Sequence, residues 1–314
     1  TSYEIPKCDW SSDVCSYDLL AAILAFATLG ASAQVTISGK YSTFVDSTKT
    51  GSTREGTMVV DPTSNINITA KEDLGGGLSA RAIVETTIGT TNTVDGTNNT
   101  QLGDRQSTVG LASKLGSVDI GRAVHSQFLA LTSNDAFGTL YGSVAGDIHN
   151  LRGLRYSNGA FVTANLGPLA ASFDRSNNGA GVADVSSYSL GAALGPVNGV
   201  VARYENATGT EKSTVVGANT KFGNTGVFYT HSDNISATVG ETKKGDLIGV
   251  SQGFGAYTAK VSYGKTNTDI KAYNAGVDYN LSKRTAVGVA YRVVDKVGTA
   301  TDVKALGVGI THRF

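Results

Sequence analysis

The sequence has few of the residues that mark a disulfide-rich, helical or disordered protein. Its 314 residues include two Cys, four Pro, one Met and one Trp, and charged residues make up 17%. Disordered chains combine high charge with few apolar residues, and helices avoid Gly, which numbers 39 here and exceeds its typical share of about 7%. The abundant Gly, Thr, Ser, Asn, Val and Tyr therefore indicate many strands and many turns.

The chain also lacks a hydrophobic run long enough for a transmembrane helix. The longest apolar stretch covers residues 19–30, short of the ~20 residues that a bilayer requires. It is followed by Ala-Ser-Ala and fits a secretory signal with its cleavage site, so we expect a truncated signal peptide over residues 19–33 and a mature chain from Gln34. Residues 1–18 resemble a translated sequencing adapter, and we expect an artefactual leader there.

Neither the charge nor the cysteines predict nucleic acid or a metal as a partner. Residues 34–314 hold 25 basic and 22 acidic side chains, and a net charge of +3 is too small for nucleic-acid binding. Cys8 and Cys15 have no second Cys pair or nearby His to complete a metal site. We therefore expect no nucleic acid, no metal and no other cofactor.

Residues 34–314 place apolar side chains at every second position, which is the period of a β-strand. Residues 272–281, 286–294 and 306–314 are the clearest examples. Short turns alternate along the chain with longer polar loops. The expected turns are 73–77, 113–116, 167–168, 195–198, 222–225, 253–255 and 280–283, and the expected loops are 46–56, 91–104, 125–150, 176–185, 206–212, 232–244, 265–270 and 295–303.

Seven turns and eight loops join sixteen strands, and an even number of strands with both termini on the short-turn side is typical of an outer-membrane barrel. Sixteen strands leave an aqueous channel, whereas about eight fill with side chains. We therefore predict an all-β fold, a 16-stranded antiparallel transmembrane β-barrel over residues 34–314. Alternation places these charged residues on its inner face: Lys40, Arg81, Glu85, Arg155, Arg203, Glu205, Lys260, Asp278 and Arg292.

Aromatic residues support the same architecture. Membrane barrels carry aromatic girdles on their outer face where strands reach the two interfaces. The outward parity places the following aromatic residues near strand ends: Tyr156, Tyr188, Tyr204, Tyr263, Tyr279, Tyr291 and Phe314.

Five short motifs then resemble a known family. They are Lys-Glu-Asp-Leu-Gly-Gly-Gly-Leu at 71–78, Val-Gly-Leu at 109–111 with Leu-Gly-Ser-Val-Asp-Ile-Gly-Arg at 115–122, Ala-Phe-Gly-Thr at 136–139, Leu-Arg-Tyr at 154–156, and the terminal His-Arg-Phe. In this order, the chain resembles the trimeric general porins of Gram-negative outer membranes, most closely the beta-proteobacterial type. The resemblance implies an integral outer-membrane protein, a homotrimer in lipid, and a terminal Phe314 that serves as the signal for the barrel-insertion machinery.

The resemblance also implies that the third loop, residues 125–150, folds into the barrel and faces a basic wall. Arg122 and Arg155 lie in the matching motifs and carry over to that wall; for Arg122 this requires a bulge near Gly121, because strict alternation would turn it outward. Asn65 departs from the family, which usually has a further wall arginine there. The expected constriction has a basic wall of Lys40, Arg81, Arg122, Arg155, Arg203, Lys260 and Arg292, and acids Asp135 and Asp147 on the loop and Glu85 on the wall.

The predicted function is a water-filled channel for passive diffusion of small hydrophilic solutes and inorganic ions, with a modest anion preference from its basic lining. A substrate-specific channel is an alternative. A sugar-specific pore would carry a row of aromatic residues along its lumen, but most aromatic residues here have outward parity, and Phe44 is one exception. A barrel enzyme would need a nucleophile beside a base, and no G-x-S-x-G motif occurs. The histidines available to such an enzyme are His125, His149, His231 and His312. An adhesive β-protein is a further alternative.

Overall fold

Antiparallel strands make up most of the protein, whose structure is a computed structural model. It describes residues 33–89, 101–138, 140–149, 154–177, 184–236, 241–296 and 302–314. The expected leader, 1–18, and the expected signal peptide, 19–33, lie outside the described residues except for Ala33.

Each strand pairs with its neighbour in the chain, as in an up-and-down barrel, except that β2 and β3 both pair with β1. The expected turns at the short-turn end are all present, and several use a glycine with positive φ, such as Gly167 at 67° and Gly223 at 57°. The strands are β1 (Gln34–Thr50), β2 (Thr53–Val60), β3 (Asn65–Gly75), β4 (Leu78–Thr87), β5 (Gln106–Ser113), β6 (Gly116–Val124), β7 (Arg155–Leu166), β8 (Leu169–Ser176), β9 (Val185–Leu194), β10 (Val197–Asn206), β11 (Glu211–Phe222), β12 (Thr225–Ser236), β13 (Glu241–Phe254), β14 (Tyr257–Thr266), β15 (Ile270–Asn280), β16 (Thr285–Lys296) and β17 (Val303–Arg313).

The predicted sixteen-stranded barrel is confirmed, because β2 and β3 together occupy one strand position. The first half of β1 pairs with β3 and its second half with β2, and residues 61–64 interrupt this position. The ring closes where β1 pairs with β17. At the end of this seam, Gly39 and Phe314 exchange backbone N–H···O hydrogen bonds of 3.0 and 3.1 Å.

Two expected loops are shorter than the sequence indicates. The segment 46–56 was expected to be a loop, but β1 and β2 continue through it to a turn at 51–52. The segment 232–244 is also mostly strand, since β12 and β13 pair as far as Ser236 and Glu241. Polar residues such as Thr and Ser fit an exposed strand as well as a loop, so polarity alone overestimates these loops.

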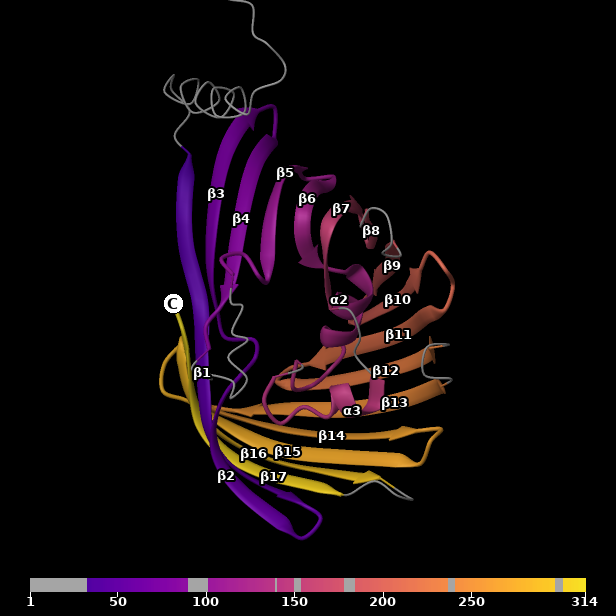
Figure 1. Ribbon diagram of the computed structural model, residues 1–314. Helices are drawn as coiled ribbons and strands as arrows, with labels where there is room; N and C mark the ends of the chain where they lie inside the picture. The colour runs from indigo at the N-terminus through magenta and orange to yellow at the C-terminus, as the bar shows by residue number, and fades with distance from the viewer. Residues whose placement is uncertain are drawn as a thin grey trace, which may run out of the picture.

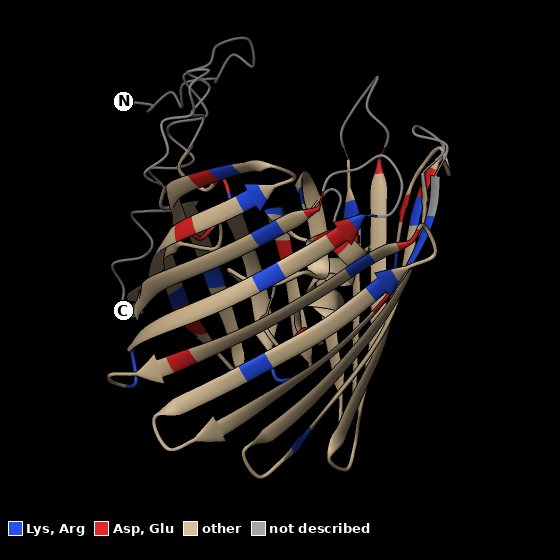
Figure 2. Cartoon of the chain, turned by 90° about the horizontal axis from the view of Figure 1, so that it is seen from below, with Lys and Arg blue, Asp and Glu red and all other residues tan. Residues whose placement is uncertain are grey.

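The outer face of the barrel is apolar. Val109 and Ile120 are opposite each other and exposed, as are Tyr263 and Tyr273. Figure 2 shows charged residues as isolated bands on strands that are uncharged along most of their length. In an outer-membrane barrel such a face contacts lipid, so its exposure here is the expected state.

Two of the tyrosines expected on the outer face lie on the inner face of the barrel instead. Tyr156 and Tyr204 are buried and pack with Ala123 and Phe161. The prediction that they belong to the outer girdle is wrong. Both strands have large side chains at neighbouring positions there, so alternation within one strand does not identify the outer face.

The closure seam generates the first prediction. A Cβ at Gly39 would meet the carbonyl oxygen of Asn65 and would lie 2.6 Å from Cζ of Phe314. Gly39→Ala should therefore destabilise the folded barrel by about 1–3 kcal/mol, the usual cost of overpacking. The measurement is the temperature at which the folded band disappears on a heat-modifiability gel. Gly199→Ala on β10 is the control, because nothing lies within 4 Å of its added Cβ; equal melting of both variants would contradict the role of the seam.

Candidate pore constriction

The long third loop turns into the barrel and carries two short helices. They are α2 (Ser126–Thr132) and α3 (Ala145–His149), and Figure 1 shows both inside the ring of strands. Among the described residues, no helix has the length and apolarity needed to cross a membrane. Helix α2 contacts β8 to β11, and α3 contacts β12 to β15. The inward fold predicted for residues 125–150 is thus present in the described part of that loop.

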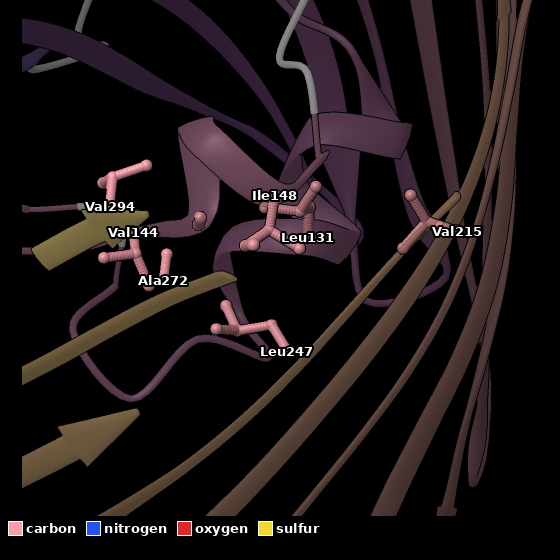
Figure 3. Packing of buried hydrophobic residues seen from close by; sticks show 8 residues of the cluster. Leu131, Val144, Ile148, Val215, Leu247, Ala272 and Val294 are labelled. Atoms are coloured by element: carbon pink, nitrogen blue, oxygen red, sulfur yellow. The ribbon is translucent and has the colours of Figure 1, made fainter. Parts of the chain in front are cut away.

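An apolar patch on the inner wall holds the loop. Leu131, Val144 and Ile148 of the loop are almost completely buried and belong to one cluster, which Figure 3 shows. Burying a side chain of this size stabilises the packed state by about 1.5–3 kcal/mol. The wall contributes Val215, Leu247, Ala272 and Val294 to the same cluster.

Glycines on the inner wall provide the space that the loop occupies. At Gly264, for example, a Cβ would lie 2.6 Å from Cγ1 of Ile148. Because a side chain there would displace the loop, these positions require glycine for close approach rather than for an unusual φ. Six wall glycines lie so close to the loop that an added Cβ would meet a loop residue. They are Gly217 (next to Asn134), Gly245 and Gly264 (Ile148), Gly249 (Ala136), Gly276 (Phe137) and Gly307 (Tyr141).

Hydrogen bonds fix the loop along its length. The N–H of Ser126 donates to Oδ2 of Asp174 at 2.9 Å, and Nδ2 of Asn274 donates to the carbonyl of Gly142 at 2.6 Å. The N–H of Tyr141 donates to Oδ2 of Asp61 at 2.8 Å. Two of these bonds hold the described loop against β8 and β15, and the third joins it to Asp61 between β2 and β3, so the open part of the lumen lies on the side of β3 to β6.

The histidines have structural contacts. His125 caps α2 by accepting a bond from the N–H of Phe128, and its ring stacks on Tyr156 with centroids 5.6 Å apart. His149 Nδ1 lies 2.8 Å from the Ser232 hydroxyl, but Ser232 is 0% exposed and no substrate reaches it. Burial, with the nearby charge of Lys243, lowers the pKa of His149 to about 3, so this ring is neutral at ordinary pH.

The other two histidines lie away from the inward loop. His231 and His312 lie on the outer face, where His231 contacts Asp246 and His312 contacts Thr285. In the part of the chain that the structure describes, no group of three or more His, Cys, Asp or Glu residues could hold a metal ion.

The two loop acids differ in their surroundings. Asp135 is only 5% exposed, and its carboxylate accepts bonds from the Phe137 N–H and the Ser143 hydroxyl. The prediction that Asp135 presents its charge to the pore is therefore wrong, because it stabilises the loop's own turn. Asp147 lies 3.7 Å from Nη1 of Arg292 and joins the loop to the wall.

Most of the predicted wall cations are lumenal and paired with acids. Lys40 is 3.5 Å from Asp61, and Lys260 is 2.7 Å from Asp278 and 5.7 Å from the centroid of Phe137. Nε of Arg81 donates to Asp119 at 2.8 Å, near the short-turn end. Pairing leaves each of these sites with little net charge.

Arg203 does not line the lumen. It lies opposite Tyr188 on β9 and Thr214 on β11, two residues from the exposed Val201, and pairs with Glu205 at 3.1 Å on the same outer face. The prediction that Arg203 and Glu205 are inward is wrong. The segment 200–205 has apolar residues at both parities, and pairing with β9 and β11 decides which of them faces outward.

Five charged residues, which we call the rim cluster, meet at the loop ends of β4 to β7. They are Glu85, Asp104, Arg105, Arg122 and Arg155. Arg105 pairs with Glu85, which also accepts a bond of 2.8 Å from Asn65, the residue that departs from the family pattern. Nε of Arg155 is buried and has no hydrogen-bond partner among the described residues.

A shift of register is present near Gly121, between Gly121 and Ala123 in the pairing with β7, but the pairing of β6 with β5 continues through Arg122 without a shift. Arg122 lies opposite the exposed Ser107 and two residues from the exposed Ile120, so it keeps the outward parity and the prediction that a bulge turns it into the lumen is wrong. Its guanidinium donates to the carbonyl of Asp104 at 2.6 Å and to the hydroxyl of Ser157 at 2.9 Å. The group is thereby held at the rim of the barrel.

Sequence reasoning missed two residues of this region. Asp61 is only 1% exposed and lies in the interruption between β2 and β3. Its carboxylate forms an ion pair with Lys40 and accepts a hydrogen bond from the backbone N–H of Tyr141 in the loop. Arg105 immediately precedes β5 and lies just beyond the outer loop expected at 91–104. The Asp-Pro-Thr-Ser sequence at 61–64 is the available signal, since these residues favour turns over a continuous strand.

Comparisons with known proteins agree with this geometry. The profile of the Gram-negative porin family matches residues 20–299. The fold is similar to an anion-selective porin from Comamonas acidovorans, with a TM-score of 0.75 and 22% identity over 90% of this chain and 100% of that chain. It is also similar to Salmonella typhi OmpF in complex with daunomycin, with a TM-score of 0.72 and 16% identity over 90% and 98% of the two chains. No curated protein sequence matches.

The chain belongs to the Gram-negative porin family. It is an integral protein of the outer membrane and forms a channel for passive diffusion of small hydrophilic solutes. The sixteen-stranded barrel and the inward loop are the features that a diffusion channel requires: a wide lumen and a fixed constriction.

The wall glycines generate the second prediction. A Cβ at Gly245 would meet the carbonyl oxygen of Ile148 and lie 2.8 Å from its Cγ2, so Gly245→Ala should displace α3. We expect larger current fluctuations in single-channel recordings. Gly253→Ala on the same strand is the control, because its nearest neighbour would be 3.5 Å away. Recordings of Gly245→Ala that match the wild type would contradict the packing described here.

Proposed function

We propose that this porin prefers anions modestly and that the rim cluster carries the preference. Three guanidinium groups there, Arg105, Arg122 and Arg155, face two carboxylates, Glu85 and Asp104. Asp104 also accepts bonds from the Thr87 N–H and hydroxyl. The excess positive charge lies at the loop-end rim of the barrel, where a low-dielectric wall strengthens its attraction for anions.

The preference is modest because the other lumenal cations are compensated. Lys40, Arg81, Lys260 and Arg292 each have a carboxylate partner, which for Arg292 is Asp147 of the loop. We propose that these pairs leave the lumenal wall close to neutral, so that they add little to the selectivity. The similar porin from Comamonas acidovorans is described as anion-selective, which supports the same sign here.

The arginines generate the third prediction. Arg155→Ser removes one positive charge of the rim cluster and should reduce the anion-preferring reversal potential under a salt gradient by a measurable fraction, without closing the channel. Arg203→Ser removes an equal charge from the outer face and should leave the potential unchanged. A shift of similar size in both variants would show that the preference does not come from the lumen.

We further propose a homotrimer whose subunits meet at the outer face of β3 to β7. Among the described residues, the exposed aromatic side chains lie on β8, β9 and β11 to β16 and at Phe314, and none lies on β3 to β7. Membrane-facing walls carry aromatic girdles, so this gap favours contact with protein instead of lipid. Small outward residues there, such as Ala80 and Ala82, allow two walls to approach closely.

The trimer generates the fourth prediction. Ala82→Trp on the girdle-free face should block close approach and convert trimers into monomers in detergent, measured by light scattering. Val261→Trp, on the aromatic-rich β14, adds the same side chain to an exposed outer position and should leave trimers intact. Dissociation by the second variant alone would place the interface elsewhere.

We also propose Phe314 as the signal for the insertion machinery. Its ring is exposed on the outer face beside His312 at the end of the closing seam, where a partner protein could contact it.

A further inference from the structure

Below the inward loop, on its short-turn side, lies a cavity of about 250 Å³. We call it the sub-loop cavity. Its walls come from β1, β14, β15, β16 and β17, and its roof is the loop segment around Tyr141. In an outer-membrane barrel the short turns face the periplasm, so the cavity opens to that side.

One part of the cavity is aromatic and apolar. Phe44 of β1 and Tyr141 of the loop stack with ring centroids 4.0 Å apart and an interplanar angle of 13°. Phe137 and Leu140 of the loop border the same space. Phe44 was the inward aromatic residue that the sequence left unexplained, and its ring forms a platform on which a planar group can stack.

The charges around the cavity leave one cation uncompensated. Lys260 pairs with Asp278 at 2.7 Å, and Lys40 pairs with Asp61 at 3.5 Å. Arg313 borders the cavity, and its guanidinium forms no hydrogen bond or ion pair with any described residue.

Arg313 also lies directly opposite Lys40 in the pairing of β1 with β17. Two like charges at directly opposed positions repel each other across antiparallel strands. A bound anion would relieve this repulsion, and a guanidinium binds carboxylates through two parallel N–H···O bonds.

We propose that the sub-loop cavity binds small aromatic carboxylates, with the carboxylate on Arg313 and the ring against Phe44 and Tyr141. The volume is just below the ~300–1,000 Å³ of sites for drug-sized ligands, which fits one ring with its acid group. The ligand contacts are separate from the rim cluster, so this inference rests on the channel and not on its proposed anion preference.

The test measures how benzoate reduces the chloride current of the complete barrel in a planar bilayer. Acetate, which lacks the ring, and benzamide, which lacks the charge, are compared at equal concentrations. Benzoate should reach half-block at a concentration about tenfold lower than either, because only benzoate uses both the guanidinium and the platform.

Variants separate the two contacts. Arg313→Gln should raise the half-blocking concentration of benzoate about tenfold or more, and Arg313→Lys should raise it less because the charge remains. Phe44→Leu should raise the half-blocking concentration of benzoate roughly threefold to tenfold and leave that of acetate unchanged. Arg284→Gln, in an exposed short turn, and Phe228→Leu, on the inner face of β12, are matched controls outside the cavity.

Benzoate that blocks no better than acetate and benzamide would overturn the proposal, as would controls that shift as much as Arg313→Gln and Phe44→Leu. Each variant is first checked for heat-modifiable migration, which shows that the barrel has folded. If benzoate fails in a channel that still prefers chloride, the sub-loop cavity is refuted and the proposed selectivity stands. If the channel prefers cations but benzoate block depends on Arg313 and Phe44, the cavity stands and the selectivity proposal falls.

Discussion

Closure of the sheet is the constraint on which the rest of the structure depends. A bilayer offers no water to an unpaired strand edge, so every backbone N–H and C=O that faces lipid must be bonded within the protein. The β1–β17 pairing satisfies this requirement, and the reciprocal bonds of Gly39 and Phe314 complete it at the C-terminus. The closed ring then fixes the diameter of the lumen and the strands against which the loop must pack.

The closed barrel would be a wide tube without the third loop. Its position depends on steric fit as much as on charge: apolar residues such as Ile148 fill the space left by wall glycines, and buried polar bonds such as that from Tyr141 to Asp61 fix the backbone. This arrangement divides the lumen. Charge on the covered wall is neutralised in pairs, while the rim cluster and Arg313 remain beside open space.

The sequence was sufficient for the barrel because strand alternation and turn residues are local patterns. It was insufficient for side chains whose face depends on partners distant in the chain. Arg203 and Tyr204 exchange their expected faces because β9 and β11 set the register, and Asp135 turns into the loop because its bonds close a local turn. Asp61 was missed because only the folded loop brings Tyr141 to it.

The most direct test of this account asks which wall of the lumen is open. In residues 34–314, which contain no Cys, Ile83→Cys introduces a thiol on the inner face of β4, and Ser232→Cys introduces one on β12 behind the loop. A water-soluble thiol reagent is then added during single-channel recording. We predict that it rapidly lowers the current through Ile83→Cys and leaves Ser232→Cys unchanged. Equal reaction at both positions, or reaction at Ser232→Cys alone, would contradict the position of the channel between the loop and β3 to β6.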